Sequence, residues 1–266
     1  KTEHWQSYLF YRNISPQYRS DVGFVVKNNR RWGTLFHEYN NIINKPVLQS
    51  FSFGTKIDLV YTFEDLYKNF SIDLFASLKT YGQTEIRYTL DYDAVKTFLE
   101  VRFNNLPTHS FSLNGSPSES FNFRASVDSG KDLSVNEEIP EVGKLKSSFL
   151  SLNFQVNDNL IINPSLRYSK LERLDGSGNY FEGNIARLNV RYQFTNAFNI
   201  RLISQKNTFT NQFFIQPLVQ WNPNPSTIFY FGGNQNTIEE IEGAHFQLLQ
   251  FNQTQFFFKF QYLIGL

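Results

Sequence analysis

Cysteine is absent from this sequence of 266 residues. That absence removes disulfide frameworks, thiol nucleophiles and cysteine-based metal sites together, and it fits proteins that cross an oxidising periplasm. Long hydrophobic runs are also missing, since no stretch approaches the roughly 20 apolar residues of a membrane-spanning helix. No lysine-rich run occurs and the formal net charge is +1, so we do not expect nucleic acid as a partner.

The start of the chain lacks the features of a signal peptide. Residues 1–5 lead into a polar and aromatic stretch that has no apolar core and no cleavage site. We therefore expect the numbering to begin inside a longer precursor. Length alone leaves both one large barrel and two ordinary globular domains open.

Aromatic residues are abundant and dispersed. The chain has 29 Phe and 14 Tyr, yet its mean hydropathy is −0.39. Phe and Tyr alternate with Asn, Ser, Gln and Arg in place of gathering in apolar runs. This arrangement indicates a sheet with one apolar face and one polar face.

Strict alternation marks several strands. In residues 150–156 every second residue is apolar, and the pattern resumes in 162–169 after a polar turn at 157–159. Residues 186–194 and 198–202 repeat it around a turn at 195–197. Further alternating stretches are 51–63, 70–79, 85–92, 213–222 and 256–264. The sequence thus predicts an all-β protein, a transmembrane antiparallel β-barrel of about 14 strands, with 12–16 as the range, formed by one domain over residues 1–266.

Weaker strands complete that count, and the connections suggest a topology. The weaker strands are expected near 20–27, 32–43, 98–103 and 118–128. Short turns at 157–159, 195–197 and 222–226 alternate with longer connections at 129–146, 171–179 and 234–253. Outer-membrane barrels have short periplasmic turns and long extracellular loops, so the short turns are assigned to the periplasm. The stretch 104–118 is then a long periplasmic connection.

The last segment is a full amphipathic strand. Its alternating residues resemble the terminal assembly signal of outer-membrane barrels, although Leu266 stands where an aromatic residue is the commoner ending. A barrel needs its final strand to pair with its first, because unpaired backbone groups are costly in hydrocarbon. We expect the strand at about 254–265 to pair with 20–27, or with 5–12 if there is an extra strand.

Four stretches resemble one protein family more specifically. They are 187–195 leading to 199–202, then 216–225, 19–25 and 256–263. Together they resemble a Bacteroidota outer-membrane family of unassigned function, in which a domain similar to family-9 carbohydrate-binding modules precedes a C-terminal barrel. The resemblance covers only the barrel part. It implies strands and turns but no catalytic residue, and any sugar-binding role would belong to the preceding domain.

The polar side of the predicted strands carries charged residues. A Lys or Arg facing lipid at the midplane would cost about 2–4 kcal/mol, so we expect these side chains to face the lumen. They are Lys56, Asp58, Asp73, Lys79, Glu85, Arg87, Arg167, Arg187, Arg191, Arg201 and Lys259. On the same strands Leu152, Phe154, Leu188, Val190, Phe258 and Phe260 should face lipid, with Asn153 and Asn189 toward the lumen. Interstrand salt bridges are the favoured interpretation over an ion-selective ring, and the arginines of the second half are the best candidates for an anionic contact.

Other chemistry is weak in this sequence, and no cofactor, metal site or catalytic residue is expected. The histidines, which are His4, His37, His109 and His245, have no metal-ligand spacing. Gly232 and Gly233 are interpreted as a strand-end pair and not as a phosphate loop. The run 239–242 is expected to be a solvated acidic loop and not a cation site. Asp91 and Asp93 have same-face spacing but no partner acid or nucleophile.

Three functions remain to be weighed. The first is a membrane anchor or scaffold in a cell-envelope protein assembly of the bacterial outer membrane. The second is a channel or transporter for small solutes, since about 14 strands lie between filled barrels and the 16–18-stranded porins. The third, a barrel enzyme, is disfavoured because no serine-centred motif appears. Expected partners are membrane lipid, lipopolysaccharide and other outer-membrane or periplasmic proteins.

Overall fold

The computed structural model describes residues 3–19, 28–64, 67–135, 137–242 and 246–263. Every long regular element in these residues is a β-strand. Among them, no helix has the length and apolar character needed to cross a membrane.

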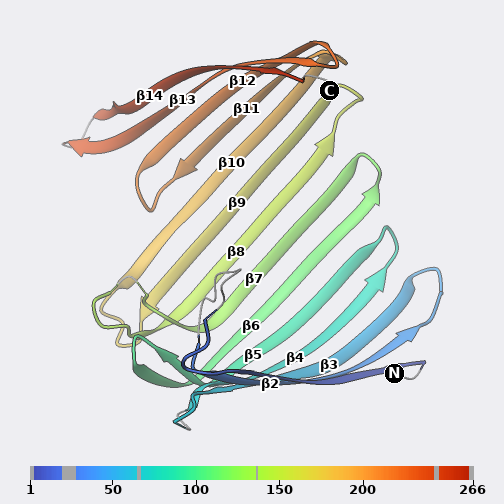
Figure 1. Ribbon diagram of the computed structural model, residues 1–266, viewed down its shortest axis with the longest axis vertical. Helices are drawn as coiled ribbons and strands as arrows, with labels where there is room; N and C mark the ends of the chain where they lie inside the picture. Colours follow the sequence, from blue (N-terminus) through green and yellow to red (C-terminus); the bar gives the residue numbers. More distant parts are fainter. Residues whose placement is uncertain (1–2, 20–27, 65–66, 136, 243–245, 264–266) are drawn as a thin grey trace. The chain divides into compact units, whose positions relative to one another are not determined.

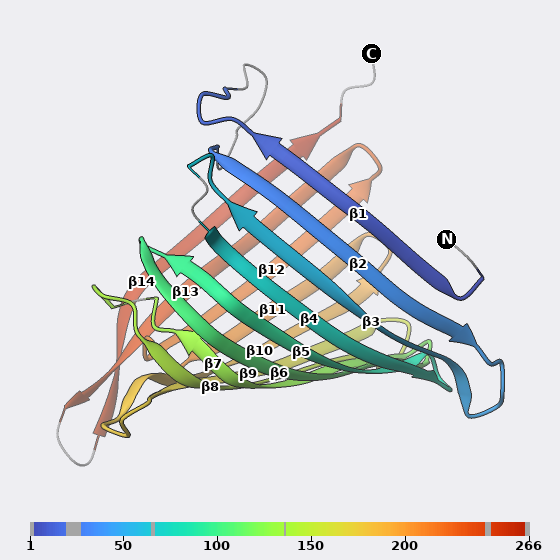
Figure 2. The ribbon, with the colours of Figure 1, turned by 90° about the horizontal axis from the view of Figure 1, so that it is seen from below.

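Fourteen strands follow one another in chain order (Figure 1). They are β1 (Trp5–Ile14), β2 (Arg30–Ile42), β3 (Leu48–Tyr61), β4 (Tyr67–Thr80), β5 (Thr84–Phe98), β6 (Val101–Ser118), β7 (Phe121–Leu133), β8 (Val142–Gln155), β9 (Leu160–Arg173), β10 (Asn179–Thr195), β11 (Phe198–Asn207), β12 (Gln212–Asn224), β13 (Thr227–Glu242) and β14 (Phe246–Tyr262). In the sheet each strand is hydrogen-bonded to its neighbours in the chain. The antiparallel hairpins of β1 to β5 are seen side by side in Figure 2.

The predicted fold class is confirmed. The chain is an all-β protein with the strand number, antiparallel pairing and chain-order topology of an outer-membrane β-barrel. The turn predicted at 157–159 falls between β8 and β9, whereas the turns predicted at 195–197 and 222–226 include the last residues of β10 and β12, so that only 196–197 and 225–226 lie between strands. The turns could be predicted because polar and apolar residues alternate along a strand with one apolar face, and this alternation stops where the strand ends.

The start of the sheet differs from the predicted scheme. β1 covers Trp5–Ile14, the segment that was expected to be a strand only if the barrel had an extra one. The strand expected at 20–27 lies outside the described residues. β1 and β14 are the first and last strands of the sheet order. The pairing that would close the barrel therefore stays a prediction.

The region 98–118 was interpreted wrongly. Phe98 ends β5, Leu99 and Glu100 make the turn with positive φ values of 47° and 63°, and the supposed connection 104–118 belongs to β6. Asn105 adopts a left-handed φ of 59° inside the strand. Asparagine tolerates that conformation better than most residues, and it interrupts the alternation that sequence analysis relies on.

The three long connections were also predicted with the wrong extent. The connection expected at 129–146 covers only the residues between Leu133 and Val142, and the one expected at 234–253 is replaced by β13 and β14. The connection at 171–179 shrinks to the residues between Arg173 and Asn179. Spanning a bilayer takes about 9–11 residues of a tilted strand, so the ends of longer strands meet water on both faces and lose their alternation.

The chain divides into two compact units. Unit 1 comprises residues 1–114, 126–147 and 170–180, and unit 2 comprises 115–125, 148–169 and 181–266. In unit 1, Phe103, Leu106 and Leu133 form a buried apolar cluster, against which Phe98 and Val142 pack. The extent of the barrel as one domain over 1–266 stays a prediction.

Candidate functional site

The polar face of unit 1 is centred on an ion-pair group in β3 and β4. The Lys56 ammonium hydrogen-bonds the Asp58 carboxylate, and its Nζ lies 3.7 Å from Asp73 Oδ2. The Trp32 indole N–H donates to Asp58 Oδ1 at 3.0 Å. The structure thus brings together three residues of the predicted lumen set and supplies each with a partner.

An aromatic pair lies beside this group, and sequence analysis did not assign it. The rings of Phe36 and Phe75 stack with centroids 5.9 Å apart, and the Arg87 guanidinium lies 4.3 Å from the centre of the Phe75 ring. Phe75 is in phase with Asp73, so period-2 spacing could have placed it on the polar face. A Cβ on Gly54 would come within 2.7 Å of the Phe75 ring, which shows that the ring occupies the space above this glycine.

Further carboxylates of unit 1 lie beside a lysine, a serine or another carboxylate. Lys96 Nζ lies 3.2 Å from Asp93 Oδ2 and 3.8 Å from Asp132 Oδ1. Ser110 donates to Asp128 Oδ1 at 2.7 Å. Asp91 is the direct cross-strand neighbour of Asp73. Among the described residues, no group of three His, Cys, Asp or Glu side chains is arranged to hold a metal ion.

The basic residues of unit 2 are placed differently. Arg167 lies over the Phe149 ring, with its Cζ 4.9 Å from the centroid, and Lys259 Nζ lies 5.8 Å from the centre of the Tyr230 ring. Arg187 is the cross-strand neighbour of Gln205. These residues are therefore spread along the polar face, and each neighbours an aromatic ring or an amide.

Arg191 and Arg201 are the two predicted residues that unit 2 brings together. They are direct cross-strand neighbours in β10 and β11. A cavity of about 180 Å³ opens at this point of the sheet. Its lining consists of Arg191, Gln193, Asn199, Arg201, Leu218 and Gln220. This is a concave polar site, and we treat it as the candidate site of the chain.

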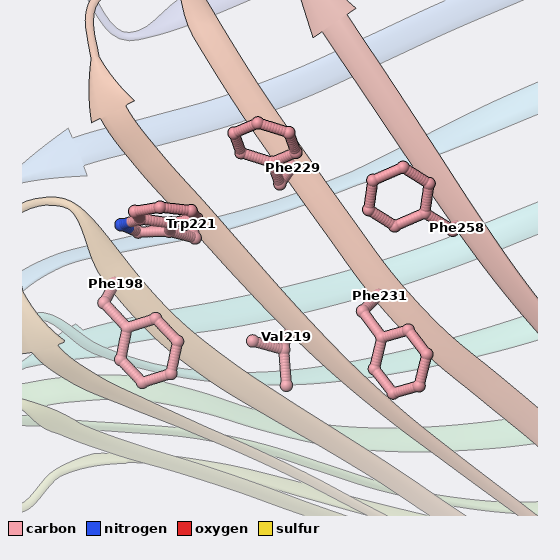
Figure 3. A pocket seen from close by; sticks show the side chains of 6 residues that line it. All are labelled: Phe198, Val219, Trp221, Phe229, Phe231 and Phe258. Carbon is pink, nitrogen blue, oxygen red and sulfur yellow. The ribbon is translucent and has the colours of Figure 1, made fainter.

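The opposite face of unit 2 is apolar. Figure 3 shows side chains from β11 to β14 around a shallow hollow of about 560 Å³. They are Phe198, Val219, Trp221, Phe229, Phe231 and Phe258. Phe258 is 65% exposed and Phe260 54% exposed. Since Lys259 lies between them in a strand and contacts Tyr230, the basic and aromatic rows occupy opposite faces, as the alternation predicts. Which face meets lipid stays a prediction.

The remaining predicted features fall outside any site. The ring Nδ1 atoms of His37 and His109 lie 2.7 Å from the Ser7 and Tyr88 hydroxyls, and His4 Nδ1 lies 3.3 Å from the Asn40 carbonyl oxygen. His245 is outside the described residues. Gly232 and Gly233 do not end a strand, because they lie within β13 opposite Phe257 and Phe256. The acidic run 239–242 is likewise part of β13 and not a loop.

A separate polar contact in unit 1 joins the connection that precedes β2 to the connection between β3 and β4. Asn29 Nδ2 donates to both oxygens of the Glu64 carboxylate, at 3.2 and 3.0 Å, and Asn29 Oδ1 accepts from the Phe63 backbone N–H at 3.0 Å. Hydrogen bonds to the ionised form favour it. The Asn29 side chain thereby lowers the pKa of Glu64 below that of an ordinary glutamate.

Asn29→Ala is expected to move the pKa of Glu64 back toward its ordinary value. Because the pKa is depressed in the folded chain, this contact contributes stability above the ordinary carboxyl pKa and loses it as the pH falls through the lowered value. Carboxyl carbon NMR titration of the folded chain measures the shift. Asn28→Ala is the control, since Asn28 donates to the Pro16 carbonyl oxygen. An unchanged Glu64 titration in Asn29→Ala would contradict the assigned cause.

Comparisons with known proteins add little beyond the fold. No protein-family model matches the chain, and no curated protein matches it. Among solved structures it is similar to OmpT of Vibrio cholerae, an outer-membrane protein in trimer form, with a TM-score of 0.35, 6% identity, and 97% of this chain and 96% of that chain covered. It is also similar to a FadL homologue of Pseudomonas aeruginosa, with a TM-score of 0.30, 7% identity, and 91% and 70% covered. At these values the likeness carries no information on function.

Proposed function

We propose that the chain is an outer-membrane barrel that serves as a membrane anchor or scaffold within a cell-envelope protein assembly. The observation that carries this proposal is the internal pairing on the polar face of unit 1. Lys56 is satisfied by Asp58 and Asp73, and Arg87 by the Phe75 ring. Charges that pair within the wall do not form the single-sign lining on which ion selectivity in a pore depends.

The resemblance of the chain to the Bacteroidota barrel family supports the same proposal. In that family the barrel follows a domain similar to carbohydrate-binding modules. A barrel joined to such a domain would hold it at the membrane. The proposed surroundings are membrane lipid and lipopolysaccharide against the aromatic face, and other envelope proteins at the ends of the strands. The proposal includes no catalytic activity.

A channel for small solutes is the second candidate, and the observation that favours it lies in unit 2. β11 and β12 contain no Asp or Glu, whereas Arg191 and Arg201 line a cavity on the polar face of β10 and β11. A lining of one charge sign is the usual basis of ion selectivity in a pore. An anion-preferring conductance would therefore be expected if the barrel conducts.

Conductance of the full chain in planar bilayers separates the two candidates. The scaffold predicts no steady ohmic openings from protein whose insertion is verified by heat-modifiable migration on gels. Steady openings with an anion preference would replace the scaffold by the channel. Verification of insertion is essential to this test, because aggregated protein is silent as well.

A further inference from the structure

Two arginines face each other directly in the sheet of unit 2. Arg191 in β10 and Arg201 in β11 are cross-strand partners, and their side chains line the same cavity. Directly opposed residues of an antiparallel pair have Cβ atoms about 4.5–5.5 Å apart, and like charges in this position destabilise the sheet. A folded chain retains such a pair most readily when an opposite charge lies between the two groups.

The described lining of the cavity contains no acidic side chain that could supply that opposite charge. Among the residues that the structure describes, neither arginine forms an ion pair or a hydrogen bond through its side chain. Arg201 Nε is buried and has no hydrogen-bond partner. A buried donor without an acceptor is costly, so part of the hydrogen-bonding capacity of the Arg201 guanidinium is left unmet by the chain. In unit 1, by contrast, Lys56 forms an ion pair with Asp58 and lies 3.7 Å from Asp73.

The other walls of the cavity suit a hydrated or hydroxylated anion. Gln193, Asn199 and Gln220 present carboxamides, each of which can donate and accept. The Gln220 amide N–H₂ already donates to Asn222 Oδ1 at 3.2 Å. A cavity of about 180 Å³ is large enough for an anionic group together with ordered water.

We infer that Arg191 and Arg201 form a binding site for a small oxyanion, either a phosphate or a carboxylate group, held between the two guanidinium forks. The planar fork of arginine donates two parallel N–H bonds to such groups, which gives both affinity and orientation. The neighbouring carboxamides bind the solvated side of the ligand. This inference applies equally to a scaffold and to a channel, because the binding test below does not require that the barrel conducts.

The test is anion binding by the purified full chain folded in non-ionic detergent. Inorganic phosphate, acetate and chloride are titrated at matched ionic strength and pH, and the heat of binding and the thermal unfolding midpoint are recorded. Phosphate or acetate is expected to raise the midpoint above that in chloride, because a ligand that binds only the folded chain stabilises it. Whichever of the two binds more tightly identifies the ligand group.

Arg191→Gln and Arg201→Gln should each weaken binding of that anion about tenfold or more, since each removes charge-assisted hydrogen bonds. Arg187→Gln is the matched control. It removes the same charge from the same face of β10, opposite Gln205 and outside the cavity lining, and should leave the affinity within about twofold.

Arg201→Lys distinguishes a loss of anion affinity at the site from a loss that results from poor folding. It keeps the charge and removes the fork, so a folded variant with weakened binding supports the site. Two results would overturn the inference: an equal effect of chloride and the two oxyanions on the wild-type chain, or an equal loss of affinity in Arg187→Gln and Arg201→Gln.

Discussion

Phe258→Arg is expected to lower the stability of the membrane-inserted barrel by about 2–4 kcal/mol if this residue lies near the bilayer midplane, and by less toward an interface. Phe258 is 65% exposed in β14 and belongs to the aromatic row that includes Phe229 and Phe231. A charge there would have to enter hydrocarbon. Phe258→Asp should likewise hinder membrane assembly. Heat-modifiable migration, with unheated and boiled samples compared, reports how much folded barrel forms.

Two substitutions on the same strand are controls for Phe258→Arg. Gln255→Arg adds the same charge on the other face of β14, and Lys259→Gln removes the basic group that contacts Tyr230. Both should leave the yield of folded barrel nearly unchanged. If Phe258→Arg and Gln255→Arg behave alike, the assignment of the aromatic row to lipid fails.

Gly130→Ala is expected to destabilise the folded chain by about 1–3 kcal/mol, because the added methyl group has no room without a movement of the backbone. A Cβ at Gly130 would lie 2.2 Å from the Pro107 carbonyl oxygen and 2.5 Å from Thr108 Cα in the adjacent strand β6. Backbone atoms cannot yield as a flexible side chain can. Equilibrium unfolding in urea, from detergent or vesicles, measures the change in the free energy of unfolding.

Gly33→Ala is the matched control for this substitution. A Cβ at Gly33 would meet no atom within 4 Å, and its φ is not in the left-handed region. The same replacement should there be neutral or stabilise by about 0.4–1 kcal/mol, since alanine restricts the unfolded chain. Equal losses at the two glycines would show that the change reflects residue type and not the close approach of β6 and β7.

The sequence was most informative where a strand has one apolar face. The alternation in β8 to β12 located the strands and their tight turns, because each polar or apolar residue reports its own face. It failed at β6, where Pro107 and the left-handed Asn105 resemble loop residues. It failed again over residues 234–253 of β13 and β14, where Asn, Gln and Glu residues remove the contrast between the faces, although the later part of β14 was predicted from its alternation. In that region the two strands pair through backbone hydrogen bonds, and such pairing cannot be predicted from the residue types.

The candidate site was also only partly predictable from the sequence. Spacing placed Arg191 and Arg201 on the polar face, but only the register of β10 with β11 makes them direct neighbours. Register depends on the turn between the strands, and one residue more in that turn would separate the two guanidinium groups. The ring of Phe75 was missed for another reason, since an aromatic residue on a polar face contradicts the pattern from which faces are assigned.

Pairing of every strand with its neighbours in the chain also bears on how such a protein folds and evolves. Each hairpin closes only a short loop, so the entropy lost on bringing two strands together is small and folding can proceed hairpin by hairpin with low contact order. A hairpin contributes one strand in each direction. Duplication or deletion of one hairpin, such as β11 with β12, would therefore change the circumference of the barrel by two strands and leave the direction and facing of all other strands intact.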